Sequence, residues 1–142
     1  MTRRIRRSGW ILCLAMAAIG CGDKAAEDKP QVAPPMATPT SSILFVADRQ
    51  IPLRWTKKTY RTEAGQVELR VDNPSEAVHN VAVEQGRTCC RQPGNRQFGY
   101  TNTISPGETA RAVVKLSPGR YWAYCGVDGH WQGGMISRLI VK

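Results

Sequence analysis

Apolar and polar residues alternate along most of the chain after residue 42, and this period-two pattern restricts the fold more than any other feature. The pattern is visible in QVELRVD, HNVAVE and ETARAVVKL, and around Ile136, Leu139 and Ile140. Turn-forming triplets such as Asn73-Pro74-Ser75, Pro93-Gly94-Asn95, Ser105-Pro106-Gly107 and Ser117-Pro118-Gly119 separate the runs. Short alternating runs between such turns are typical of antiparallel strands. About seven or eight of them predict an all-β, Greek-key β-sandwich.

Residues 1–20, MTRRIRRSGWILCLAMAAIG, have the composition of an export signal. Four arginines precede an apolar stretch from Trp10 to Ile19, which is shorter than the ~20 apolar residues that a permanent membrane span needs. The stretch ends in Ala18-Ile19-Gly20-Cys21, which resembles a bacterial lipobox. That resemblance implies that Cys21 is lipidated and becomes the mature N-terminus. Cleavage of an ordinary secretory signal nearby would leave Cys21 incidental.

Residues 21–42 contain four prolines, several alanines and almost no large apolar side chains. Such a segment buries too little surface to offset the entropy of ordering it, and its prolines favour extended conformations. We therefore expect a disordered tether that carries one folded domain, residues 43–142. If Cys21 is lipidated, the tether holds that domain on the extracytoplasmic face of a membrane.

Much of the positive charge belongs to the targeting segment. The whole chain carries a net charge of +9, and without the four arginines of residues 1–20 the remaining sixteen basic and eleven acidic side chains give +5. The sequence contains no arginine-rich stripe with interleaved aromatic residues, which a nucleic-acid-binding surface would need. We therefore expect no nucleic-acid partner.

The segment CGVDGHWQGGM places Cys125, His130 and Met135 in one glycine-rich loop that follows the apolar run YWAY. A thiolate, an imidazole and a thioether together suit copper far better than magnesium or calcium. The only other histidine is His79, at the start of a separate predicted strand. Two histidines, one cysteine and a weak axial methionine form the ligand set of a blue-copper electron-transfer site.

These residues lie within sequence that resembles the cupredoxins, and among them the small plastocyanin-like, auracyanin-like and halocyanin-like proteins. The matching motifs are Val71-Asp72-Asn73-Pro74, His79-Asn80-Val81, Pro106-Gly107-Glu108-Thr109, Pro118-Gly119-Arg120-Tyr121, Tyr124-Cys125, Gly129-His130 and Gly134-Met135. The resemblance implies that His79, Cys125, His130 and Met135 bind one type 1 copper ion. It also implies that Asn80 ties the loop of the first histidine to the loop of the cysteine. Asp128 departs from the pattern, because relatives with this loop often have proline there.

Three further side chains have more than one interpretation. Trp131, beside His130, could form an apolar contact for a redox partner or could pack against its own loop. Cys89 and Cys90 are adjacent in an exported chain, where two cysteines usually form a disulfide, but a bridge between neighbours is geometrically difficult. They could form it nevertheless, stay free, pair between chains or capture copper.

The interpretation that joins these observations is an exported, monomeric blue-copper protein that carries single electrons between redox partners. A c-type cytochrome, an oxidase or a reductase would be such a partner. Copper enzymes of related folds need additional histidines, and His79 and His130 are already assigned, so we expect no enzymatic activity. The alternative is a periplasmic copper-handling protein, a carrier, store or sensor, on the same fold.

Overall fold

The computed structural model describes residues 38–142 of the chain, and these residues form eight β-strands and no α-helix. The strands are β1 (Ser41–Val46), β2 (Thr59–Thr62), β3 (Gly65–Asp72), β4 (Ala82–Gln85), β5 (Arg96–Tyr100), β6 (Thr109–Leu116), β7 (Gly119–Tyr124) and β8 (Ile136–Val141). The prediction of an all-β fold is therefore confirmed. The expected export signal, Cys21 and nearly all of the expected tether lie outside the described residues.

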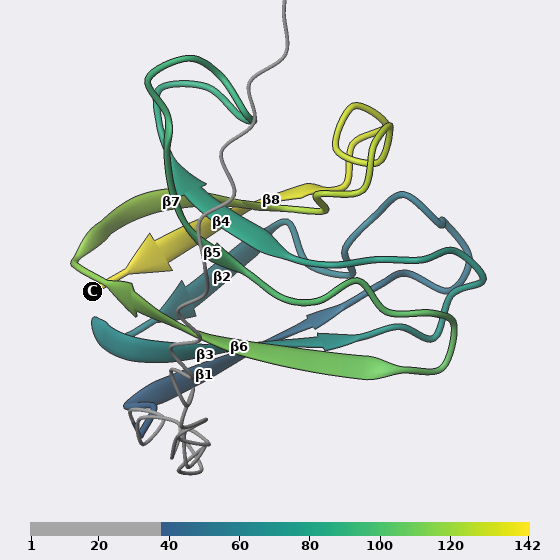
Figure 1. Cartoon of the computed structure of the whole chain (residues 1–142), viewed down its shortest axis with the longest axis horizontal. Helices are drawn as coiled ribbons and strands as arrows, with labels where there is room; N and C mark the ends of the chain where they lie inside the picture. The colour runs from purple at the N-terminus through teal and green to yellow at the C-terminus, as the bar shows by residue number, and fades with distance from the viewer. Residues whose placement is uncertain (1–37) are drawn as a thin grey trace, which may run out of the picture. The chain divides into compact units, whose positions relative to one another are not determined.

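The strands form two sheets that pack face to face (Figure 1). One sheet has the order β1-β3-β6 and the other has the order β2-β8-β7-β4-β5. Two pairs, β1 with β3 and β2 with β8, are parallel, although the alternation alone indicated antiparallel strands. The reason is that the chain moves to the other sheet between the members of each pair, so the second member returns in the same direction as the first.

The side chains between the two sheets follow the period-two pattern. Phe45, Leu69 and Leu116 come from the smaller sheet and are buried, and Val83 and Leu139 meet them from the larger sheet. Each large apolar side chain buried in this way stabilises the fold by about 1.5–3 kcal/mol relative to an exposed one. This core supports the loops at the end of the sandwich opposite the C-terminus, where β7 ends and β8 begins (Figure 1).

The last strand differs from the simple apolar pattern. Ser137, Leu139 and Val141 face the core, whereas Ile136 and Ile140 lie on the outer side and are half-buried. The Ser137 hydroxyl is accommodated inside because it donates a hydrogen bond of 2.6 Å to the carbonyl of Lys57. A serine can therefore occupy a core position that hydropathy alone would assign to isoleucine.

The first strand begins at Ser41, two residues before the expected domain boundary at residue 43. Ser41 pairs with Val67 in the parallel ladder of β1 and β3, and its hydroxyl also donates to the carbonyl of Glu63. Backbone pairing and a polar side-chain contact thus extend the strand into residues that carry no apolar signal.

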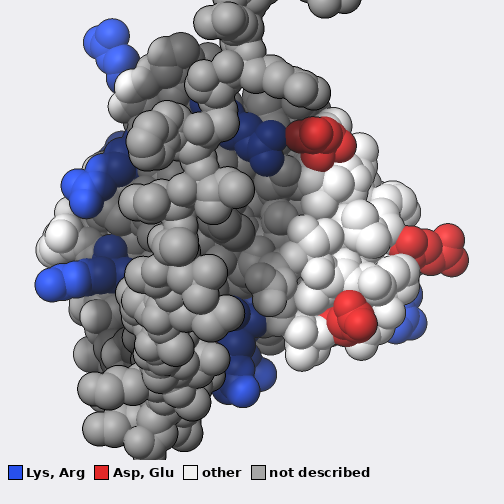
Figure 2. Space-filling model, viewed as in Figure 1, with Lys and Arg blue, Asp and Glu red and all other residues white. Residues whose placement is uncertain are grey.

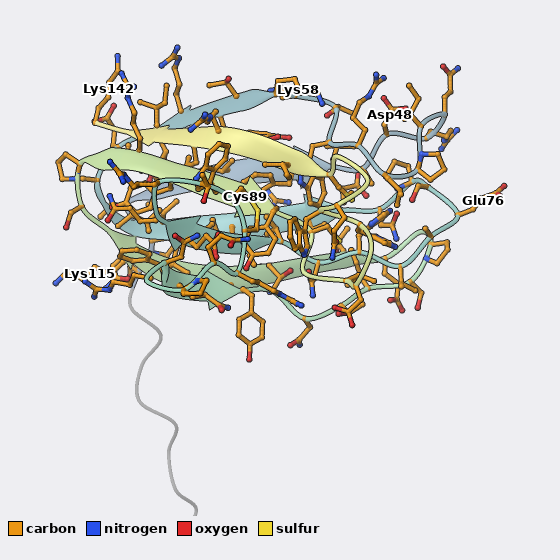
Figure 3. The ribbon with its side chains drawn as sticks, turned by 90° about the horizontal axis from the view of Figure 1, so that it is seen from above. Asp48, Lys58, Glu76, Cys89, Lys115 and Lys142 are labelled. Atoms are coloured by element: carbon orange, nitrogen blue, oxygen red, sulfur yellow. A yellow bond between two sulfur atoms is a disulfide. The ribbon has the colours of Figure 1, made fainter. Side chains whose placement is uncertain are left out.

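In the part of the face that grey atoms leave visible in Figure 2, most Lys and Arg side chains lie on the left and the Asp and Glu side chains lie on the right. Lys115 and Lys142 lie toward one end of the domain, while Asp48 and Glu76 lie toward the other, as Figure 3 shows. Within residues 38–142, no helix is long and apolar enough to cross a membrane.

Candidate metal centre

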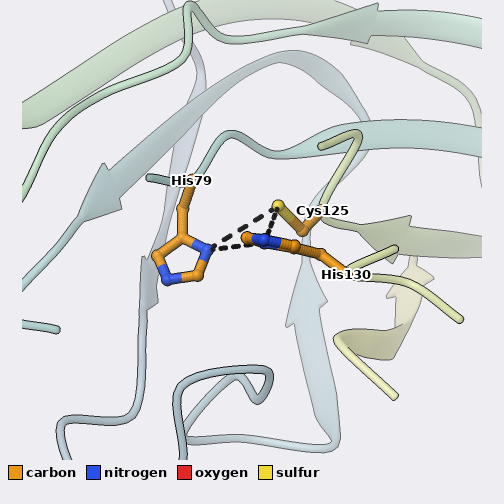
Figure 4. A group of neighbouring side chains, drawn as sticks. All are labelled: His79, Cys125 and His130. Atoms are coloured by element: carbon orange, nitrogen blue, oxygen red, sulfur yellow. Dashed lines mark hydrogen bonds between the residues drawn. The ribbon is translucent and has the colours of Figure 1, made fainter. Parts of the chain in front are cut away.

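Three potential metal ligands converge at the loop end of the sandwich, as Figure 4 shows. The Cys125 Sγ atom lies 3.7 Å from His79 Nδ1 and 3.5 Å from His130 Nδ1. The two Nδ1 atoms are 3.3 Å apart. Cys125 and His79 are buried, and His130 is half-buried. The structure therefore brings together three of the four residues that the sequence assigned to copper, with their donor atoms facing one another.

The backbone of His79 is fixed before any metal is considered. Its N–H donates to the carbonyl of Ile104 at 3.0 Å, and its carbonyl accepts from the Ile104 N–H at 2.8 Å. This isolated bridge joins the segment before β4 to the segment after β5. The ring of His79 also lies beside the buried ring of Trp55, with 6.2 Å between centroids. His79 is thus held in position by contacts from two other loops.

A chain of hydrogen bonds determines which ring nitrogen of His79 carries the proton. The Asn73 amide is oriented by donation from Nδ2 to the Ala77 carbonyl at 2.7 Å, so its Oδ1 accepts the Ser75 hydroxyl at 2.7 Å. That hydroxyl has only one hydrogen, so at its 2.9 Å contact with His79 Nε2 the ring must donate. Nδ1 is then the nitrogen with a free lone pair, and it faces Cys125.

Ser75 was missed as a functional residue at the sequence level. The triplet Asn73-Pro74-Ser75 was visible there only as a turn. Its position four residues before His79 is a usable signal, because a hydroxyl in a turn just ahead of a ligand histidine can reach that ring.

The loop between β7 and β8 closes on itself through its backbone. Cys125 N–H donates to the Met135 carbonyl at 3.0 Å, and Met135 N–H donates to the His130 carbonyl at 3.0 Å. Gly134 has a backbone φ of 105°, which residues with a side chain rarely adopt, and this conformation lets the loop turn into Met135. Met135 is buried with the core immediately before β8. Its backbone therefore contacts both Cys125 and His130, and coordination of a metal by its sulfur stays a prediction.

Asn80 joins the two ligand-bearing segments, as the family resemblance implied. Its Oδ1 accepts the Gly126 N–H at 2.6 Å and lies 4.0 Å from the Cys125 Sγ atom. Its Nδ2 donates to the Thr103 hydroxyl at 3.1 Å. Contacts of this kind fix the orientation of metal ligands.

Burial keeps both imidazoles neutral at neutral pH. It lowers the pKa of His79 to about 4, with a smaller contribution from the nearby His130, and it also lowers the pKa of His130. Burial raises the pKa of the Cys125 thiol, which hydrogen bonds from the backbone N–H groups of Asn80 and Val127 partly oppose. Neutral imidazoles can donate lone pairs to a metal, and the metal would compensate the cost of a buried thiolate.

This donor set fits copper. The two imidazole nitrogens and the cysteine sulfur all lie within 4.8 Å of one another, close enough to bind the same ion. Met135 is buried in the core next to them in the chain's fold. Such a combination is diagnostic of blue-copper sites, whereas magnesium and calcium prefer oxygen ligands. His79, Cys125, His130 and Met135 would hold the ion, and within residues 38–142 Cys125 is the one free cysteine.

A second group of possible ligands, Glu84 with Cys89 and Cys90, has a different character. Cys89 and Cys90 are bonded to each other in a disulfide, which resolves the alternatives that the sequence left open. Both carboxylate oxygens of Glu84 already accept hydrogen bonds from the Arg91 N–H, and the Tyr124 hydroxyl and the Asn95 amide donate to it as well. This group therefore connects strands β4 and β7 to the loop that follows β4.

Trp131 is half-buried in a small apolar cluster on the outer face of the larger sheet, with Tyr124 and Cys90 among its members. Its indole Nε1 is buried and has no hydrogen-bond partner. The structure thus places Trp131 against neighbouring side chains, and contact with a redox partner through this residue stays a prediction.

Asp128, the departure from the family pattern, forms an ion pair with Arg91 at 3.0 Å.

Three auracyanins are among the solved structures of similar fold. Auracyanin B has a TM-score of 0.63 and 19% identity, with 74% of this chain and 91% of that chain covered. The dithionite-reduced auracyanin of the photosynthetic bacterium Roseiflexus castenholzii has a TM-score of 0.62 and 19% identity, with 74% and 99% covered. Auracyanin A of Chloroflexus aurantiacus, described as a "blue" copper protein, has a TM-score of 0.58 and 18% identity, with 71% and 98% covered.

At these identities the likeness shows the fold, which together with the ligand cluster defines a cupredoxin, as the sequence predicted. The sulfocyanin (SoxE) domain model matches residues 71–142, half of the chain, and this match includes all four candidate ligands. The chain belongs to the sulfocyanin (SoxE) domain family. A comparison with curated proteins finds no match.

Proposed function

We propose that this protein is an exported blue-copper electron carrier that exchanges one electron at a time with redox partners. The observation that carries the proposal is the convergence of His79 Nδ1, His130 Nδ1 and Cys125 Sγ within 3.3–3.7 Å of one another. A copper ion bound to these atoms supplies a one-electron couple between Cu(I) and Cu(II).

The surrounding residues hold the ligands in place independently of the metal. His79 is fixed through its backbone by Ile104 and through its ring by Ser75, while Asn80 holds the peptide that follows Cys125. Ligands that are held in this way move little when the charge of a bound ion changes. A small rearrangement favours rapid electron exchange, and it is less suited to a protein that must release its metal to an acceptor.

His130 is the ligand that a partner would meet first. Its side chain is half-buried, whereas His79, Cys125 and Met135 are buried. A redox protein that docks at the loop end would therefore come closest to the centre at the His130 ring. We propose a c-type cytochrome, an oxidase or a reductase as the class of partner.

The cellular setting belongs to the same proposal. The signal-like residues 1–20 and the lipobox-like segment before Cys21 support a lipid-anchored protein on the extracytoplasmic side of a membrane, for instance in the periplasm. The tether would let a monomeric domain reach partners at some distance from its anchor. Both histidines of the chain lie in the candidate centre, so none is left to hold a separate catalytic copper, and we propose that the protein is not an enzyme.

The test is to add one equivalent of Cu(II) to the purified protein and to record the visible spectrum before and after ascorbate. An intense blue band that bleaches on reduction and returns on reoxidation is the expected result. A protein that binds copper tightly without this band, and that passes Cu(I) to a metal-free acceptor, would replace electron transfer with copper handling. Failure to bind copper at all would refute both functions.

A further inference from the structure

The loop between β4 and β5 is attached to the outer face of the larger sheet. Cys90 is buried there against Ala82 and Tyr124, and it is bonded to Cys89, which Figure 3 labels. Trp122 donates through its indole N–H to the Gly86 carbonyl at 3.3 Å, near the start of the loop. The loop thus lies over the end of β7, the strand that leads into Cys125.

Glu84 fixes the backbone of this loop at Arg91. Its carboxylate is buried and accepts the Arg91 N–H at 3.0 and 3.1 Å to its two oxygens. The same carboxylate accepts the Asn95 side-chain amide at 2.8 Å and the Tyr124 hydroxyl at 3.3 Å. A buried carboxylate with several donors is a firm anchor, because breaking any of these contacts leaves a polar group unsatisfied. The backbone at Arg91 is therefore held in a fixed position on the larger sheet.

The Arg91 side chain extends from this anchor to the ligand loop. Its guanidinium donates from Nη2 to the Gly126 carbonyl at 2.5 Å and from Nη1 to Asp128 Oδ1 at 3.0 Å. On the other side, Asn80 Oδ1 accepts the Gly126 N–H at 2.6 Å. Gly126 directly follows Cys125, so side chains from two other segments hold the N–H and the carbonyl of the first residue after the thiolate ligand.

We propose that Arg91 is a positioning residue of the metal centre, which holds the Cys125–His130 loop by its hydrogen bond to the Gly126 carbonyl. The proposal rests on the copper site proposed above. Neither the alternating pattern nor the ligand motif contains Arg91, which lies 34 residues before Cys125 in the printed sequence.

The ion pair with Asp128 is a separate and weaker part of the contact. The side chains of Arg91 and Asp128 are 50% and 93% exposed, and such exposed pairs contribute little to stability because solvent and salt screen their charges. Their charges nevertheless lie beside the ligand loop, so removal of one partner leaves the other uncompensated there. Substitution of Arg91 and of Asp128 in turn can therefore separate the effect of Arg91 on the position of the ligand loop from the effect of the two charges on the metal centre.

The experiment compares copper-loaded full-length protein with the variants Arg91→Ala, Arg91→Lys and Asp128→Asn. Arg87→Ala is the matched control, because Arg87 is an exposed arginine of the same loop. Two properties are measured: the midpoint potential, and the electron paramagnetic resonance and visible charge-transfer spectra of the oxidised copper. The potential reports charge, while the spectra report the placement of the ligands.

Arg91→Ala is expected to stabilise Cu(II) over Cu(I) about tenfold, a fall of about 59 mV for a one-electron couple, and to change both spectra. Asp128→Asn is expected to shift the potential the opposite way with little spectral change, because it removes only the carboxylate. Arg91→Lys keeps the charge but lacks the planar fork that reaches two acceptors, so it restores the potential and leaves the spectra altered. Arg87→Ala changes neither property.

Identical spectra for Arg91→Ala and Arg87→Ala would overturn the proposal, and so would full recovery of the spectra in Arg91→Lys, which would reduce the role to charge alone. If Arg91→Ala does not fold, the spectra of Arg91→Lys decide the matter by the same criterion. These results apply to a parent protein that is blue. A parent without a blue band would refute the proposed function itself, so the two failures are distinguishable.

Discussion

The hydrogen bond between Ser75 and His79 gives the sharpest test of how the protein prepares its ligands. Ser75→Ala removes the hydroxyl oxygen that contacts His79 Nε2 at 2.9 Å. The Asn73 Oδ1 atom keeps the backbone N–H of residue 75 as a donor, at 3.2 Å. The ring of His79 is buried, with an exposed fraction of 0%, so water does not replace the lost partner. The substitution therefore creates an unsatisfied buried N–H without removing a metal ligand.

Two magnitudes follow from this geometry. An unsatisfied buried donor costs about 1–3 kcal/mol, so the free energy of unfolding of the metal-free protein should fall by that amount. Loss of a group that orients a ligand histidine typically weakens metal binding about 10–100-fold. The second effect is expected here because, without the Ser75 oxygen, the ring is no longer held with its proton on Nε2 and can present a protonated Nδ1 toward Cys125.

Ser137→Ala is the matched control. Ser137 is also buried, with an exposed fraction of 2%, and its hydroxyl donates to the Lys57 carbonyl rather than to a ligand. Urea denaturation measures the stability of each metal-free variant, and competition with a chromophoric chelator measures copper affinity. Both variants should lose stability, but only Ser75→Ala should lose copper affinity. Equal copper affinities in the two variants would refute the argument that Ser75 sets the protonation of His79.

Three further predictions concern the ligands themselves. Cys125→Ser should abolish the blue colour, because a hydroxyl cannot replace thiolate-to-copper charge transfer, and a variant that stays blue would show that the ligand assignment is wrong. Met135→Leu should retain copper and raise the midpoint potential measured by voltammetry, because an apolar side chain disfavours the more highly charged Cu(II); an unchanged potential would argue against Met135 as the axial ligand. In the metal-free protein, the pKa of His79 falls from the ordinary 6.5 to about 4 on folding, so the unfolded state binds more protons between these values. Stability should therefore be complete above about pH 6.5 and decrease toward pH 4 by no more than about 3 kcal/mol, and a flat urea-denaturation profile over this range would contradict the assigned burial of His79.

The sequence by itself determined the class of fold and the candidate ligand set. Period-two alternation is a local property, since each residue needs only its neighbours to define a face of a strand, and it correctly placed Leu69 and Val83 inside. The scarcity of histidine left His79 and His130 as the only imidazole candidates, and the glycine-rich loop placed Cys125 and Met135 close to one of them.

The tertiary structure alone decided which distant residues support those ligands. The parallel pairing of β1 with β3, the inward position of Ser137 with its hydrogen bond to Lys57, and the contact of Arg91 with Gly126 all depend on how segments far apart in the sequence meet. Their hydrogen bonds form only after the two sheets have packed and brought the loops to one end of the sandwich. A local pattern cannot encode such contacts, because the partners share neither a strand nor a turn, and their proximity is a consequence of the whole fold.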